Sequence, residues 1–248
     1  MEDCTVYLEK NWRFGETSGI GRLAAGILDQ ASEDQDAPSA HDALTAILED
    51  PDYPDVGVSE LTVDEAWIPW FVRHMDDRHA KSMDIRADRR LEYWLATCWL
   101  TPLRNSRFGT RNLNRAIETR INKRLDLRRT DGWYPGRPVI VTRNDYRTGL
   151  FNGDMGVCLK DPGDGNLHVL FQTESGPRRF PVHSIPEHEP AYLLTVHKSQ
   201  GSEFEHVHLL LPPDGTPLLS RELLFTAVTR AKLTFTLHGD PKAFAQAA

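Results

Sequence analysis

The segment that decides the fold of this chain is Tyr192-Leu-Leu-Thr-Val-His-Lys-Ser-Gln-Gly-Ser-Glu-Phe204. Its apolar start predicts a buried strand, and the polar residues that follow predict a glycine-bearing turn. A hydroxyl, an imidazole, an ammonium, an amide and a carboxylate lie within the nine residues 195–203. Capping a helix needs only one or two such groups, so this density indicates a functional loop. Gly201 permits a tight turn or a close backbone approach.

An α/β rhythm surrounds this loop and continues downstream. The expected elements are a strand at 191–197, a strand at 205–211, a helix at 220–230, a strand at 232–238 and a last helix from about 241. The helix at 220–230 has one apolar face that would pack on a sheet. Arg230 ends that helix, a position that the helix dipole alone would also favour for a cation.

Upstream of the loop, from about Gly132 to Glu189, short β-rich runs alternate with Gly, Asn, Asp and Pro turns. This pattern predicts a small antiparallel barrel of SH3-like size, inserted inside the α/β domain. The expected strands are Pro138–Arg143, Met155–Lys160, Leu167–Gln172 and Arg179–Val182. The dipeptide Asn152-Gly153 is by itself a strong hairpin signal.

The first half of the chain is predicted to be mainly helical. We expect a strand at Thr5–Glu9, a helix from Ile20 to Leu28 capped by Ser18, a helix from His41 to Asp50, turn chemistry from Pro51 to Gly57, helical structure from Leu61 to His79, a strand at Leu95–Thr101 and a helix over 110–125.

Composition is that of an ordinary globular protein, with 40% hydrophobic and 26% charged residues. The apolar runs are far too short to span a bilayer, and no export leader opens the chain. The cysteines Cys4, Cys98 and Cys158 lie far apart without metal-ligand spacing, which fits a reducing cytoplasm. We therefore expect a cytoplasmic protein without a metal site of its own.

Basic residues concentrate in the middle of the chain although the formal net charge is −7. Between Arg104 and Arg147 there are 12 basic and 4 acidic side chains. Such a stripe is a candidate contact for a polyanion, because counterion release favours binding to phosphates. A solvated helix face would explain the charges equally well.

Five segments together resemble the RecD-type superfamily 1 DNA helicases. The block at 192–204 resembles that family's "TVHKSQGSEF" sequence, and Arg221–Lys232 resembles its motif VI, "YTAVTRA". Leu8–Ile20 resembles motif IV, and 100–114 resembles the family's block of a strand, an Arg, Phe-Gly and Leu-Asn. Gly136–Gly156 resembles the opening of its SH3-like barrel.

The resemblance implies an α/β fold, a RecA-like helicase domain 2 with an inserted SH3-like barrel, and a set of site residues. Arg13 and Arg230 would reach the γ-phosphate of ATP, Gln200, Gly201 and Glu203 would line the nucleotide or couple it to DNA, and Thr195 and His197 would touch single-stranded DNA. Arg143 and Asn144 could contact a phosphate or only cap a turn. Taken alone, Arg13 could also be a surface residue at the end of a strand.

The resemblance further implies 5′-to-3′ travel driven by ATP and Mg²⁺. For the α subunit of exodeoxyribonuclease V it implies assembly with RecB and RecC in double-strand break repair. No Gly-x-x-x-x-Gly-Lys-Ser/Thr sequence occurs, so we expect a fragment that lacks the ATP-binding P-loop and is inactive alone. The sequence Val63-Asp-Glu-Ala66 imitates a magnesium-binding acidic box, but acidic residues that open a helix explain it better.

The expected domains are 1–131 and 190–248, which form the RecA-like domain, and 132–189, which form the barrel. Within the first part, residues 31–92 match the family least and are read as a helical insert without an assigned function. Two other functions stay open. One is a stand-alone RecD-like helicase that works without RecB and RecC, and the other is a non-enzymatic SH3-like binding module.

Overall fold

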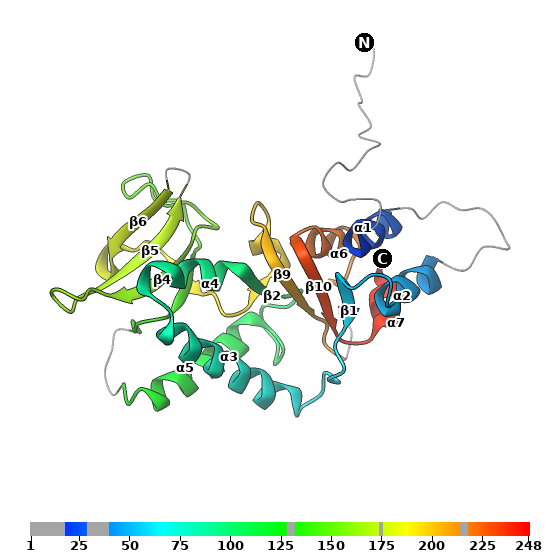
Figure 1. The fold of residues 1–248 in the computed structure, drawn as a ribbon, viewed down its shortest axis with the longest axis horizontal. Coiled ribbons are helices and arrows are strands. Elements are labelled where there is room, and N and C mark those ends of the chain that lie inside the picture. The colour runs from blue at the N-terminus through cyan, green and yellow to red at the C-terminus, as the bar shows by residue number, and fades with distance from the viewer. Residues whose placement is uncertain (1–17, 29–39, 128–131, 174–175, 214–217) are drawn as a thin grey trace, which may run out of the picture.

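A computed structural model describes residues 18–28, 40–127, 132–173, 176–213 and 218–248. Five strands in it form one parallel sheet in the order β1-β10-β9-β2-β8 (Figure 1). They are β1 (Val56–Val58), β2 (Thr97–Thr101), β8 (Leu194–Thr195), β9 (Phe204–Leu210) and β10 (Ala231–His238). An α/β fold with parallel strands is therefore confirmed.

The two faces of the parallel sheet bury different sets of side chains, because successive residues of a strand point to opposite sides. In β2, Cys98 and Leu100 belong to one hydrophobic core, whereas Trp99 belongs to another. In β9, Leu209 and Leu210 divide in the same way. Each large apolar side chain buried in this manner contributes about 1.5–3 kcal/mol.

Helices cover both faces, as parallel sheets require. The first core contains residues of α1 (Gly19–Leu28), α2 (Ala40–Glu49), α6 (Arg221–Val228) and α7 (Pro241–Ala247). The second core contains residues of α3 (Trp67–Asp84), α4 (Arg90–Ala96) and α5 (Thr110–Arg124). A short 3₁₀ helix, η1 (Ala87–Arg89), leads into α4.

A second sheet of five antiparallel strands has the order β6-β5-β4-β3-β7. Its strands are β3 (Pro138–Val141), β4 (Met155–Lys160), β5 (Leu167–Thr173), β6 (Gly176–Pro181) and β7 (His188–Pro190), with a 3₁₀ helix η2 (Val182–Ser184) before β7. This sheet lies in the chain between the parallel strands β2 and β8, as expected of an insertion. Among the described residues, its edge strands β6 and β7 do not pair with each other.

The two sheets pack against each other and share a hydrophobic core. Trp99 and Leu210 of the parallel sheet lie in the same buried cluster as Val157 and Leu170 of the antiparallel sheet. Helix α4 lies between the sheets and contacts strands of both (Figure 1).

Several element limits differ from expectation. The turn predicted to Gly57 ends at Asp55, and Val56–Val58 pairs with β10 as an edge strand. The strand predicted from Leu95 begins only at Thr97, because α4 continues to Ala96. The strand predicted over 191–197 is paired only at Leu194–Thr195, because Val196–Ser199 forms a 3₁₀ helix, η3. The strand predicted at Thr5–Glu9 lies outside the described residues.

Within the described residues, no helix combines the length and the apolar character that crossing a membrane requires.

Candidate functional site

The polar turn after β8 projects from the edge strand of the parallel sheet. Thr195 Oγ1 accepts a hydrogen bond from Lys198 N at 3.4 Å and so caps η3. The turn closes with Ser202 N donating to Ser199 O at 3.0 Å. Gly201 has φ of +82°, and a Cβ added there would meet nothing within 4 Å. Gly201 therefore serves a left-handed turn and not a close approach within this chain.

Arg230 lies directly beside this turn. Helix α6 begins at the cap residue Ser220 and ends at Val228, two residues before Arg230. Arg230 Nη1 donates to Ser202 O at 3.1 Å, and its Nε donates to Thr226 O at 3.1 Å. Backbone bonding adds a further link, since Phe204 N donates to Arg230 O at 2.9 Å. The end of α6 and the turn are thus one structural unit with a half-buried guanidinium.

The other residues proposed for the nucleotide lie on the surface of the same unit. Gln200 and Gly201 are exposed. Glu203 Oε2 is 3.2 Å from Lys232 Nζ in an exposed ion pair, which contributes at most about 1 kcal/mol. His197, in η3, is also exposed. Arg13 lies outside the described residues, so its convergence with Arg230 stays a prediction.

Glu189 is a residue of this region that sequence reasoning missed. It lies in β7, the edge strand of the antiparallel sheet, and its carboxylate pairs with Lys198 Nζ of η3. Its Oε1 also accepts from Arg104 Nη2 at 2.8 Å, although 85 residues separate the two. One carboxylate therefore joins the antiparallel sheet, the loop before α5 and the candidate site. No local pattern could have found this residue.

A hollow of about 310 Å³ lies next to Glu189, between the start of α5 and β7. Three arginines line it, namely Arg104, Arg111 and Arg115, together with Glu118 and Glu189. Part of the basic stripe expected from the sequence therefore faces a concave surface. Two other basic residues of α5, Arg120 and Arg124, contact α3 instead.

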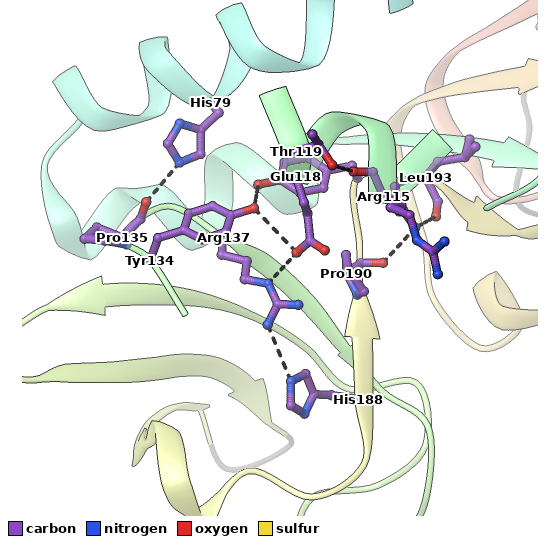
Figure 2. A network of polar contacts seen from close by, with 12 residues as sticks. His79, Arg115, Glu118, Thr119, Tyr134, Pro135, Arg137, His188, Pro190 and Leu193 are labelled. Atoms are coloured by element: carbon purple, nitrogen blue, oxygen red, sulfur yellow. Dashed lines mark hydrogen bonds and ion pairs between the residues drawn. The ribbon is translucent and has the colours of Figure 1, made fainter. Parts of the chain in front are cut away.

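Asp76 of α3 is buried and takes hydrogen bonds from two arginines of α5, Arg120 Nε at 2.8 Å and Arg124 Nε at 2.6 Å. Arg124 Nη2 also lies 2.7 Å from His79 Nδ1. His79 Nε2 lies 2.9 Å from Pro135 O, as Figure 2 shows. Because arginine only donates and a carbonyl only accepts, His79 is the neutral Nε2–H tautomer. Burial lowers the pKa of His79 to about 4.

A second set of polar contacts joins α5 to the start of the antiparallel sheet. Glu118 Oε1 accepts from Arg137 Nε at 2.6 Å and from the Tyr134 hydroxyl at 3.5 Å (Figure 2). The Tyr134 and Tyr192 hydroxyls lie 2.9 Å apart, and burial raises the pKa of both phenols. Phenols held neutral in this way act here as fixed hydrogen-bonding groups.

Asn114, from the Leu-Asn pair of the segment 100–114, holds the chain where it returns from the antiparallel sheet. Its Nδ2 donates to Pro190 O and to Leu193 O, each at 3.0 Å. Its Oδ1 accepts from Leu193 N at 3.0 Å. Asn114 therefore sets the position of β8 and, through it, of the candidate site.

Two other residues singled out in the sequence, Asp64 and Asn144, cap local backbone N–H groups. Asp64 Oδ1 accepts from Ala66 N at 2.8 Å and from Trp67 N at 3.1 Å, so Asp64 caps the start of α3. Glu65 instead accepts from Arg107 Nη1 at 2.9 Å. Asn144 Oδ1 accepts from Asn152 N at 2.8 Å across the β3–β4 loop, so its carbonyl caps that loop. Arg143, beside it, is exposed.

Comparison with known proteins identifies the family of this chain. Residues 190–237 match the family described as the UvrD-like helicase C-terminal domain. Over 256 aligned residues the chain is 36% identical to the RecBCD enzyme subunit RecD of Haemophilus influenzae, an alignment that covers 98% of this chain. The chain belongs to the RecD family of helicases.

This RecD-family chain spans 38% of the length of the Haemophilus protein. It is also 35% identical to the ATP-dependent RecD2 DNA helicase of Deinococcus radiodurans, over 60% of this chain and 21% of that protein. Among solved structures, Pif1 helicase from Bacteroides in complex with ADP-AlF3 and ssDNA matches 96% of this chain and 53% of its own, with 14% identity and a TM-score of 0.42. Structural similarity at that level supports no inference about function.

Proposed function

We propose that this chain carries the second, RecA-like motor domain of an ATP-dependent 5′-to-3′ DNA helicase. The domain comprises residues 1–131 and 190–248, and residues 132–189 form an SH3-like insertion. ATP with Mg²⁺, bound in the intact protein on a first motor domain, supplies the free energy for movement along DNA. The residues of this chain sense the nucleotide and hold the strand.

Arg230 is the observation that carries this proposal. Its guanidinium is oriented by hydrogen bonds to Thr226 O, Ser202 O and Thr229 Oγ1, and the turn that it contacts carries the exposed Gln200 and Gly201. An arginine fixed in this manner stabilises charge that develops on a transferred phosphoryl group. Arg13 would be the second arginine on the same phosphate.

Contact between Arg230 and the turn gives a physical route from nucleotide to DNA. Movement of the Arg230 guanidinium would pull on Ser202 O and thereby on η3, which carries His197. Thr195 and His197 would touch single-stranded DNA, and Arg143 and Asn144 would hold its phosphates on the antiparallel sheet.

We further propose that the intact protein is the α subunit of exodeoxyribonuclease V and assembles with RecB and RecC in double-strand break repair. Similarity to RecD of Haemophilus influenzae over 98% of this chain favours this assignment. Similarity to the RecD2 helicase over 60% of the chain favours a second candidate, a helicase that acts alone.

Strand separation by the full-length protein tests the helicase proposal. Duplexes with a single-stranded 5′ tail should be unwound with ATP, and duplexes with a 3′ tail should not. The 248-residue chain alone should turn over no ATP. Unwinding only from a 3′ tail, or robust ATP turnover by this chain alone, would contradict the proposal. Co-purification of the full-length protein with RecB and RecC would distinguish the two candidates.

A further inference from the structure

The loop between β3 and β4 presents an unusual pair of exposed aromatic rings. The Tyr146 side chain is 83% exposed and Phe151 is 45% exposed. Their ring centroids lie 5.9 Å apart with an interplanar angle of 76°, an edge-to-face arrangement. Single exposed aromatic residues are common on proteins, but an exposed pair in contact offers a surface on which a flat ligand can stack.

The loop that carries the two rings is held rigidly. Asp145 and Leu150 form an antiparallel bridge, with Asp145 N donating to Leu150 O at 2.8 Å. Phe151 N donates to Asp154 Oδ2 at 2.8 Å. The backbone that carries the rings is therefore fixed before any ligand arrives, which lowers the entropic cost of binding.

Charges around the rings favour an anionic ligand. Arg143, Arg147 and Arg178 face two carboxylates, Asp145 and Asp154, which leaves one net positive charge. Arg147 Nη2 lies 3.4 Å from Asp145 Oδ2. Arg143 is exposed, and within the described part of the chain its side chain has no hydrogen-bonding or ionic partner. Arg178 of β6 approaches the loop, since a Cβ added at Gly149 would lie 3.3 Å from Arg178 Nη1.

We propose that Tyr146 and Phe151 form a stacking site for an unpaired base of single-stranded DNA, while Arg143 and Arg178 hold the adjacent phosphates. Aromatic stacking accepts any base, because every base has a π face. This site would let the antiparallel sheet grip the strand without reading its sequence. The inference rests on the proposed DNA binding of this chain and names the contact that the inserted sheet makes.

Fluorescence anisotropy on the 248-residue chain at low salt tests the stacking site. The probes are a labelled oligo(dT) and an oligonucleotide of equal length that contains abasic sites, which keeps the phosphates but lacks the bases. Tyr146→Ala should weaken oligo(dT) binding by about tenfold and leave abasic binding unchanged. Tyr146→Phe should retain the wild-type affinity, because it keeps the ring. Leu233→Ala, at an exposed apolar position on β10, is the matched control and should change neither affinity.

The possible outcomes separate this inference from the function on which it rests. If Tyr146→Ala binds oligo(dT) as the wild type does, the stacking site is wrong and DNA binding stands. An equal loss of binding to both probes also overturns it, since the ring would then act only on the loop. If the wild-type chain binds neither probe, the proposed DNA contact of this domain fails as well.

Discussion

Arg230 Nη1 donates a hydrogen bond to the backbone carbonyl of Ser202 at 3.1 Å, across 28 residues of sequence. The bond joins the end of α6 to the turn that follows η3. Because the Arg230 carbonyl also accepts from Phe204 N at 2.9 Å, the link has two points and resists rotation. A change at the guanidinium therefore reaches the turn directly.

Substitution of Arg230 in the full-length protein should reduce catalysis much more than nucleotide binding. We expect Arg230→Ala to lower kcat for ATP by roughly 10³-fold or more, with a small change in the Kd for ATP, because an arginine of this kind acts mainly on the transition state. Steady-state turnover and equilibrium nucleotide binding measure the two effects. Arg221→Ala, at the first residue of the same helix, is the control. A wild-type kcat for Arg230→Ala would remove the residue from the mechanism.

Substitution of Glu189 should free two cations at the junction of the sheets. Glu189→Gln removes the charge that pairs with both Lys198 and Arg104. We expect the affinity of the 248-residue chain for oligo(dT) at low salt to rise severalfold, because freed cations can contact phosphates. The stability loss should stay near 1 kcal/mol, since these side chains are partly exposed. Unchanged affinity would mean that the hollow beside Glu189 does not face DNA.

Stability should fall in acid because two buried histidines, His79 and His238, and the half-buried His208 are held neutral. Burial lowers the pKa of His79 to about 4, of His208 to about 3 and of His238 to about 4, from a usual value of 6.5. The unfolded chain therefore binds protons first, so this stability is fully present above pH 6.5 and is lost as the pH falls towards about 4 for His79 and His238 and about 3 for His208. The loss for each group is on the order of a few kcal/mol, because one pKa unit corresponds to about 1.4 kcal/mol. Thermal unfolding across this range measures the loss.

His79→Gln should remove part of that acid sensitivity. Glutamine offers one donor for Pro135 O and one acceptor for Arg124 Nη2, as the neutral imidazole does, but it does not titrate near neutral pH. The exposed His183→Gln is the control and should leave the pH dependence unchanged. An unaltered acid transition in His79→Gln would show that His79 does not drive it.

Three glycines should respond differently to alanine. Gly136 has φ of +85°, and an added Cβ would lie 2.8 Å from His79 Nε2, so Gly136→Ala should cost about 2–3 kcal/mol through strain and displacement of His79. Gly201→Ala meets open space and should cost only the conformational strain of about 1 kcal/mol. Gly57→Ala in β1 meets nothing within 4 Å and is the control. Urea denaturation measures the free energy of unfolding of the three variants. Equal losses of stability would contradict the predicted clash with His79.

Local sequence patterns predicted much of this architecture. The β-rich run Met155–Lys160 between turn residues predicted β4 with both of its limits, and the series of such runs predicted an antiparallel insertion. The segment around Gln200 indicated the candidate site because its side chains are too polar for a simple cap. Arg230 was predicted to belong to the site from the resemblance of its segment to motif VI. The strand limits near Leu95 and Val196 were missed, because an apolar run alone does not say where a helix ends and a strand begins.

The sequence by itself determined the family and the identity of the residues proposed for the site, because short segments with specific side chains carry both. Only the tertiary structure decided how those residues meet. Glu189 joins Lys198 to Arg104, and Arg178 approaches the β3–β4 loop, through contacts between residues far apart in the chain. Such contacts depend on how the sheets pack, which no local pattern encodes.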